Sequence, residues 1–269
     1  MSFSKRIDEA RKAYEHKSIK ESAAAHSKEA IIKAAEEKHA GTGSAYLGEM
    51  VYGGLDGIIT TFAVVSSAAG AELTAGIALI LGLANLFADG FSMATGAYLS
   101  TKSEQELYKK EYEREAWEID HFPEGERLEL VELYIEKGYT PEEAEQLVNI
   151  HTQSKERWVN AMMIDELEMF KDETPPLRNA LATFAAFLVA GSLPLIVYLV
   201  GLAVPIAPDT AFFFSLALSA MGLFGLGAAK VFFTRQNPWR SGLEMLLVGG
   251  AAAGVAYLVG VLLKGLGAS

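Results

Sequence analysis

The sequence predicts an all-α polytopic membrane protein with five transmembrane helices and a cytoplasmic three-helix insert between the second and third of them. Hydrophobic residues make up 51% of the 269 positions and the mean hydropathy is +0.20, although 21% of the residues are charged. Five apolar stretches are long enough to cross a bilayer, which takes about 20 residues. They run approximately over residues 46–69, 73–100, 177–202, 210–233 and 243–263.

The charged residues cluster in one segment and thereby divide the chain. Between residues 102 and 173 there are 21 acidic residues against 9 Lys and Arg, a net charge of −12, whereas the rest is almost neutral. We therefore expect four parts: an N-terminal helical segment (1–45), transmembrane helices 1 and 2 (46–101), an acidic metal-binding domain (102–175) and transmembrane helices 3 to 5 (176–269). Such an acidic surface favours multivalent cations and disfavours nucleic acid. The chain has no cysteine, which excludes disulfides and thiolate metal sites.

The distribution of Lys and Arg predicts the orientation in the membrane. Nine of them precede residue 46, nine lie in the insert, and Lys230, Arg235 and Arg240 lie between the fourth and fifth spans. The loops at 70–72 and 203–209 have none. Because positive loops stay in the cytosol, the N-terminus and the insert are expected there and the C-terminus on the other side. The charged N-terminus lacks the apolar core of a cleavable signal peptide.

Helix signals subdivide the water-facing parts. Residues 102–120 would extend the second span, and Pro123 would end that helix. A second helix is expected over 124–137, and the capping box at Thr140 and Glu143 would start a third that reaches about Phe170. The first 40 residues are expected to form an amphipathic cytoplasmic helix.

Polar residues recur on one face of each of the first two spans. Asn85, Asp89 and Met93 follow the spacing i, i+4, i+8, and Glu49 and Asp56 lie seven residues apart on the preceding span, with Thr60 one turn further on. A three-residue connection joins the spans, so the two faces can meet. Carboxylates with a thioether suit Fe(II) or Mn(II), and charges at this depth usually mark an ion path. The alternative is that both aspartates are structural and the methionine fills space.

The insert repeats this ligand chemistry in water. Its candidate ligands are glutamates at helical spacing and a methionine pair one turn before a glutamate: Glu111, Glu115, Glu118, Glu126, Glu129, Met162, Met163 and Glu166. A solvated helix face is the alternative for the glutamates, but it does not explain two methionines on a polar helix. The motifs Glu36-x-x-His39 and Glu118-x-x-His121 superficially resemble those of ferritin-like di-iron bundles, but two spans separate them in sequence.

Four segments carry a resemblance to the vacuolar iron transporter family: "VYGGLDGIITTFAVVSS", "LGLANLFADGFSMATGAYLSTKSEQE", "EREAWEIDHFPE" and "WVNAMMIDELEM". The match covers about residues 44 to 264 and leaves the N-terminal 40 without a counterpart. The resemblance implies a five-span homodimer that exchanges cytosolic Fe(II) for protons. It also implies a membrane metal site at Asp56 and Met93 and an insert site at Glu115, Glu118, Glu126, Glu129, Met162, Met163 and Glu166. Glu49 and Asp89 are added from the helix faces alone.

We therefore predict a divalent metal transporter and not an enzyme, with Fe(II) as the transported ion and no prosthetic group. Mn(II), Co(II) and Zn(II) are the expected competitors, and the sequence does not separate iron from manganese as cargo. The alternative in another class is a membrane-tethered metal sensor or buffer, and a ferroxidase is the third reading. A prokaryotic plasma membrane is favoured because the chain is compact, with the vacuolar membrane as the alternative.

Overall fold

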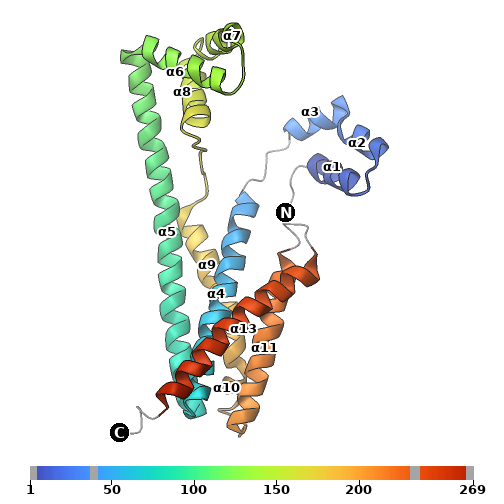
Figure 1. Ribbon diagram of the computed structural model, residues 1–269, viewed down its shortest axis with the longest axis vertical. Helices are drawn as coiled ribbons and strands as arrows, with labels where there is room; N and C mark the ends of the chain where they lie inside the picture. Colours follow the sequence, from blue (N-terminus) through green and yellow to red (C-terminus); the bar gives the residue numbers. More distant parts are fainter. Residues whose placement is uncertain (1–4, 37–41, 231–236, 265–269) are drawn as a thin grey trace. The chain divides into compact units, whose positions relative to one another are not determined.

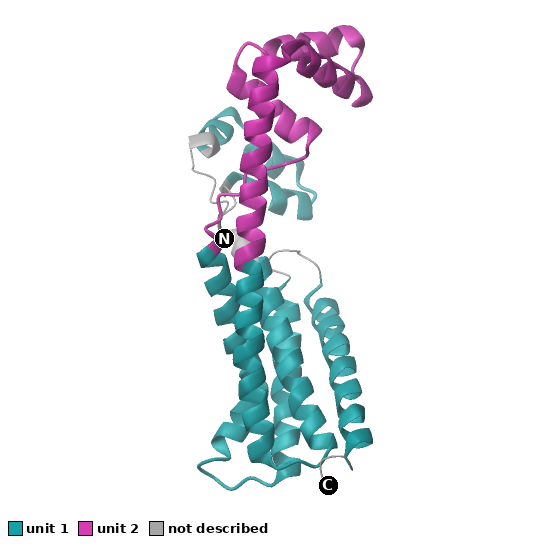
Figure 2. Ribbon diagram, turned by 90° about the vertical axis from the view of Figure 1, so that its left-hand side faces the viewer, with its two compact units in different colours: residues 1–97, 177–269 teal, residues 98–176 magenta. Residues whose placement is uncertain are grey.

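The computed structural model describes residues 5–36, 42–230 and 237–264, and within these residues every regular element is a helix (Figure 1). The chain divides into two compact units, one of residues 1–97 and 177–269 and the other of residues 98–176 (Figure 2). The long helix α5 contributes to both units. The all-α prediction is confirmed.

The first unit contains five helical stretches that are long and apolar enough to span a membrane, which confirms the predicted number. They are α4 (Thr42–Gly70), α5 (Ala75–His121), the broken span α9–η2–α10, α11 (Pro208–Ala229) and α13 (Pro238–Leu263). The predicted end of the fourth span at Phe233 and the cation Arg235 lie outside the described residues.

The third span is broken at Pro194, where the sequence predicted a kink. It consists of α9 (Pro176–Gly191), a 3₁₀ turn η2 (Leu193–Leu195) and α10 (Ile196–Val200). Proline cannot donate the backbone bond that a continuous helix requires. The buried hydroxyl of Ser215 on α11 donates to the Pro194 carbonyl oxygen at 2.7 Å, so the irregular backbone is fixed by a neighbouring span.

All spans contribute to one apolar core. Phe62 and Val65 of α4 pack there with Leu86 of α5 and with Phe187 and Leu195 of the third span. The first and third spans also meet backbone to backbone: a Cβ placed on Gly57 would lie 2.6 Å from the Phe187 carbonyl oxygen. Only glycine permits this approach, and it holds Asp56, the preceding residue, at a helix crossing.

The turn between α4 and α5 is tight and well bonded. Leu73 N donates to Ala68 O at 2.9 Å, and Glu72 N donates to Ala69 O at 3.0 Å. These two hydrogen bonds form the Schellman motif at the end of α4. Glu72 occupies the left-handed position of this motif, with φ 56°, where glycine is usual. The two helices therefore run antiparallel from this turn (Figure 1).

The second unit has its own apolar core around Leu130, Val148 and Trp158. Its helices after α5 are α6 (Pro123–Glu136), α7 (Pro141–His151), α8 (Lys155–Ala161) and the π-helix η1 (Met162–Glu166). The predicted continuation of the second span into this region is present, and the capping box of Thr140 and Glu143 is formed.

The prediction of one helix from Thr140 to Phe170 was wrong. That region is two α-helices and a π turn, because α7 ends at His151 and the Ser154 side chain accepts from Arg157 N and starts α8. Regular helix ends at Glu166, four residues before Phe170. A short polar residue that caps a new helix interrupts the old one.

The N-terminal segment also differs from the single amphipathic helix that we expected. It forms three short helices, α1 (Lys5–Glu15), α2 (Ile19–Ala25) and α3 (Lys28–Glu36). Lys17 adopts a left-handed conformation with φ 50°, and Ser18 then caps α2. His39 of the di-iron-like motif lies outside the described residues.

Candidate metal sites

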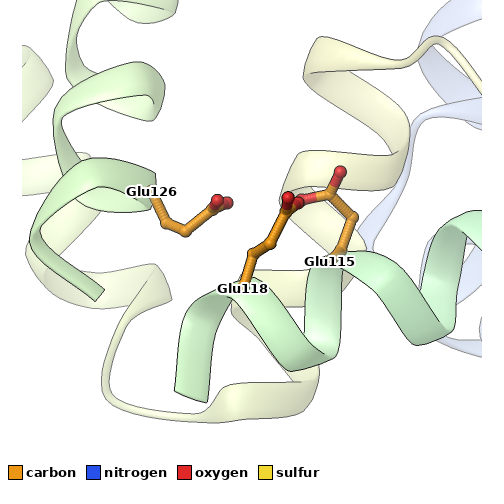
Figure 3. A group of neighbouring side chains, drawn as sticks. All are labelled: Glu115, Glu118 and Glu126. Atoms are coloured by element: carbon orange, nitrogen blue, oxygen red, sulfur yellow. The ribbon is translucent and has the colours of Figure 1, made fainter. Parts of the chain in front are cut away.

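Three glutamates of the insert converge on one point. The last turns of α5 supply Glu115 and Glu118, and the first turn of α6 supplies Glu126, whose side chain points toward the other two (Figure 3). One carboxylate oxygen of each lies within 4.8 Å of the others. The helix break at Pro123 allows this meeting, because it turns the chain so that residues eight to eleven positions apart face each other. Three carboxylates at this separation can bind one divalent cation.

Two of these carboxylates are buried. Glu115 is 1% exposed and Glu126 is 6% exposed. The Oε2 atom of each is buried and has no hydrogen-bond partner within the described residues. A buried acceptor without a partner costs free energy, and a bound cation would remove that cost.

The negative charges of the cluster favour the binding of either protons or a metal ion. Burial, followed by repulsion from Glu115 and Glu129, raises the pKa of Glu126 to about 7. Burial also raises the pKa of Glu115, although the neighbouring Arg114 opposes that shift. The pKa of Glu166 is raised by desolvation and by Glu129. Because these carboxylates repel one another, all of them belong to one electrostatic site.

A cation of the chain itself partly neutralises this site. Arg114 Nε donates to Glu111 at 2.8 Å, its Nη2 donates to Glu115 at 2.5 Å, and its Nη1 pairs with Glu118. Sequence reasoning missed Arg114. The signal was available, because a residue at i+3 from Glu111 and i−4 from Glu118 lies on their helix face.

The methionine pair lies in the apolar core of the insert. Met162 and Met163 are both 0% exposed and pack within the cluster that contains Leu130 and Val159. They begin the π turn, in which Leu167 N donates to Met162 O at 3.1 Å. π turns are rare and are frequent at functional sites. The turn ends at Glu166, which is exposed, as is Glu129.

Within the membrane bundle, the structure brings two of the predicted residues together. Asp56 of α4 and Asp89 of α5 are both half-buried, and the two carboxylates interact electrostatically. Glu49 lies two turns before Asp56 on the same helix and is partly buried. The Asn85 amide nitrogen is buried and has no partner within the described residues.

Two other predicted residues have local partners. The Thr60 hydroxyl donates to the Asp56 backbone carbonyl at 2.9 Å, a bond within one helix. Met93 is partly buried and packs against the apolar core of the bundle. Met93 shares the Asp89 face of α5, four residues further along.

The chain is similar to known proteins over most of its length. The model of the VIT family matches residues 47–261. A vacuolar iron transporter of Toxoplasma gondii is 39% identical over 267 residues, 96% of this chain and 88% of that protein. One from Plasmodium falciparum is 34% identical over 97% of each chain, and vacuolar iron transporter 1 of Arabidopsis thaliana is 32% identical over 86% of this chain and 90% of the plant protein.

The coverage corrects one expectation about the N-terminal segment. An alignment over 96% of 269 residues leaves out about eleven, so the T. gondii relative has to match most of residues 1–45. The segment therefore has a counterpart in the relatives from T. gondii and P. falciparum, although it lies outside the family model. The match of that model over most of the chain and the near full-length similarity to named relatives lead to one conclusion: the chain belongs to the vacuolar iron transporter (VIT) family, a family of transporters and not of enzymes.

Proposed function

We propose that this multi-pass membrane protein moves Fe(II), with Mn(II) as the alternative cargo, out of the cytosol in exchange for protons. The observation that carries the proposal is the pair Asp56 and Asp89, two half-buried carboxylates within the apolar spans α4 and α5. A membrane anchor has no need of such a pair, whereas a cation path does. The names of the relatives support iron as the cargo.

The proposed order of transport steps begins at the carboxylates of the insert and continues at those of the membrane spans. The insert would collect metal at Glu115, Glu118 and Glu126. The other ligands proposed for it are Glu129, Glu166, Met162 and Met163. From there the ion would reach Glu49 at the mouth of α4 and then Asp56, Asp89 and Met93. Hard carboxylates with one soft thioether favour Fe(II) or Mn(II) over Ca²⁺ and Mg²⁺.

Exchange with protons follows from the chemistry of the ligands. A carboxylate has to be deprotonated to bind a metal ion, so protons and metal compete for the same oxygens. A proton that arrives from the far side would displace the ion from Asp56 and leave toward the cytosol. The proton gradient would then drive transport without a second energy source.

A homodimer would complete the path. Asp56 and Asp89 are only half-buried within one chain, and a carboxylate that faces lipid is costly. A second copy could cover this face. Mass measurement in mild detergent should give a dimer, and full transport by chains diluted to one per liposome would contradict it.

Orientation and membrane are parts of the same proposal. The Lys and Arg distribution supports a cytosolic N-terminus and insert. The names of the relatives support a vacuolar membrane, whereas the plasma-membrane expectation rested on chain length alone.

The test is metal uptake into liposomes that contain the purified chain, with Fe(II), Mn(II), Co(II) and Zn(II), with and without a pH gradient. Wild-type protein should accumulate Fe(II) and move protons in the opposite direction. Asp56→Asn keeps the shape and loses the charge, so metal and proton movement should both fall at least about tenfold. Uptake by Asp56→Asn at the wild-type rate would refute the proposed path.

Two further variants separate roles within the path. Met93→Leu keeps the volume and loses the sulfur, so Fe(II) uptake should fall while the melting temperature changes little. Asp89→Asn should lower uptake if Asp89 relays the ion. If it lowers only the melting temperature, Asp89 is a structural residue. A chain that binds metal at the insert and carries no flux would instead be a membrane-tethered sensor or buffer.

A further inference from the structure

Within the insert, three side chains join the end of α6 to the π turn η1. The Tyr134 hydroxyl donates to Asp165 Oδ2 at 3.1 Å, and Lys137 Nζ donates to Asp165 Oδ1 at 2.5 Å. The same ammonium donates to the Asp165 backbone carbonyl oxygen at 3.1 Å. We call Tyr134, Lys137 and Asp165 the clamp. None of the three is among the candidate metal ligands.

The tyrosine of the clamp is fixed by packing. Tyr134 is 5% exposed, and its ring centroid lies 5.8 Å from that of Tyr139 and 6.1 Å from that of His151. Lys137 Nζ lies 5.7 Å from the centroid of the Tyr134 ring. Burial, followed by the charge of Asp165, raises the pKa of Tyr134. The hydroxyl therefore keeps its proton and remains a donor.

Asp165 holds the turn and is not placed to bind the ion that the glutamates would take. The carboxylates that lie within 4.8 Å of one another are those of Glu115, Glu118 and Glu126, and in the described part of the chain Asp165 does not join them. Both of its carboxylate oxygens accept hydrogen bonds from α6, and its charge is paired with Lys137.

The turn that the clamp holds carries three of the candidate ligands. Met162 and Met163 begin η1, and Glu166 directly follows Asp165. A π turn bonds residues five apart where an α-helix bonds residues four apart, so it changes the direction of Glu166 relative to the two methionines. The last carbonyls of a helix have no partner within it. Lys137 supplies that partner at Asp165, one residue before Glu166.

Helix α6 carries the clamp at one end and a glutamate of the cluster at the other. Glu126 and Lys137 are eleven residues apart, which is about three turns, so they lie on one face about 16 Å apart. Glu129 lies between them, and its carboxylate interacts electrostatically with that of Glu166. The clamp fixes η1 against α6, so the place of Glu166 beside Glu129 depends on it.

From these contacts we infer that Lys137 and Tyr134 are positioning residues for metal binding by the insert. By holding Asp165, they direct Glu166 toward Glu129. This role rests on the proposed collection of metal by the insert. It predicts the opposite of a simple charge effect, because removal of an ammonium from an acidic domain would otherwise strengthen cation binding.

The test is Mn(II) binding to the full chain in detergent, well below its melting temperature. Mn(II) is paramagnetic and quenches nearby tryptophans, and Trp239→Phe leaves Trp117 and Trp158 of the insert as the only tryptophans. Lys137→Gln should weaken binding at least about tenfold. Tyr134→Phe loses one hydrogen bond and should weaken it on the order of threefold. Lys137→Arg keeps the charge and the donors and should restore most of the affinity.

The matched control is Lys155→Gln, which removes an ammonium from another ion pair of the insert, the one with Asp120. Its affinity for Mn(II) should stay within about twofold of wild type, because both partners are exposed. Binding by Lys137→Gln that is as tight as in wild type, or tighter, would overturn the positioning role.

A second background separates positioning from a general loss of structure. In a chain with Glu166→Gln, Lys137→Gln should weaken binding little further, because its effect passes through the Glu166 carboxylate. Weakening by the same factor in both backgrounds would show a structural role alone and overturn the inference, as would wild-type affinity in Glu166→Gln. A wild-type insert whose tryptophans Mn(II) does not quench would refute the collection of metal by the insert, and the positioning role with it.

Discussion

The guanidinium of Arg114 donates to Glu115 Oε1 at 2.5 Å, although the Arg114 side chain is 42% exposed and the Glu115 side chain is 1% exposed. One half-exposed cation thus neutralises a carboxylate that is otherwise sealed in the insert. Arg114 also pairs with Glu118, so it engages two of the three glutamates that converge on one point. An incoming metal ion has to compete with it for these oxygens.

Replacement of Arg114 by glutamine should therefore have opposite effects on metal binding and on stability. Mn(II) affinity should increase on the order of tenfold, because the competing charge is gone. The metal-free insert should lose about 1–2 kcal/mol, because the buried Glu115 charge has lost its partner while water screens part of the effect. Calorimetric titration and thermal melting check the two effects. Arg157→Gln, at an exposed position of α8 in the same insert, is the control, and weaker binding by Arg114→Gln would contradict the competition.

Acidification should stabilise the metal-free insert. The pKa of Glu126 is raised from 4.5 to about 7 in the folded protein, so between these values the folded state binds more protons than the unfolded state. Stability is then highest below the unfolded pKa and is lost as the pH rises through about 7. The free energy of unfolding should be about 1 kcal/mol higher at pH 6 than at pH 8.

Tryptophan fluorescence can follow this effect in the full chain. Of the three tryptophans, Trp117 and Trp158 lie in the insert, so Trp239→Phe leaves the insert as the only source of signal. Melting with a chelator present should show the pH dependence, and Glu126→Gln should remove most of it. Greater stability at pH 8 than at pH 6 would contradict a raised pKa of Glu126 in the folded protein.

The burial of Met162 and Met163 changes how their role as ligands has to be tested. Alanine at either position would leave a cavity and cost about 2–5 kcal/mol, so weaker metal binding would report unfolding. Leucine keeps the volume and should cost less than about 1.5 kcal/mol. If a sulfur is a ligand, Met162→Leu or Met163→Leu should weaken Fe(II) binding severalfold with an almost unchanged melting curve. Unchanged affinity in both would assign the pair to the core alone.

The contact between α4 and α13 predicts a strong position effect for glycine substitutions. Gly260→Ala would place a methyl group 2.1 Å from the Ser67 carbonyl oxygen, whereas a Cβ on Gly254 of the same helix has nothing within 4 Å. The first change should destabilise the bundle by about 1–3 kcal/mol. Gly254→Ala should be neutral or slightly stabilising, because alanine is the better helix former. Thermal melting in detergent checks both changes. Equal melting temperatures of the two variants would show that the close contact between α4 and α13 does not contribute to stability.

The sequence by itself determined the properties that depend on local pattern. The length of the apolar stretches predicted five spans. A few neighbouring residues predicted the capping box at Thr140 and the helix break at Pro123. The helical period also placed Asp56 and Asp89 on faces that could meet, because a turn of this length leaves few other arrangements. These features require no knowledge of distant contacts.

Only the tertiary structure decided what lies next to what. Glu126 joins Glu115 and Glu118 because of the direction in which the chain leaves α5. Met162 and Met163 are core residues because they pack in one apolar cluster with residues of α5, α6 and α7. Glu72 of the α4–α5 turn pairs with Lys264 after the end of α13, and no periodicity relates two residues so far apart in the sequence. Burial and charge pairing between distant residues depend on how helices pack, and a helical repeat specifies only which side of one helix a residue occupies.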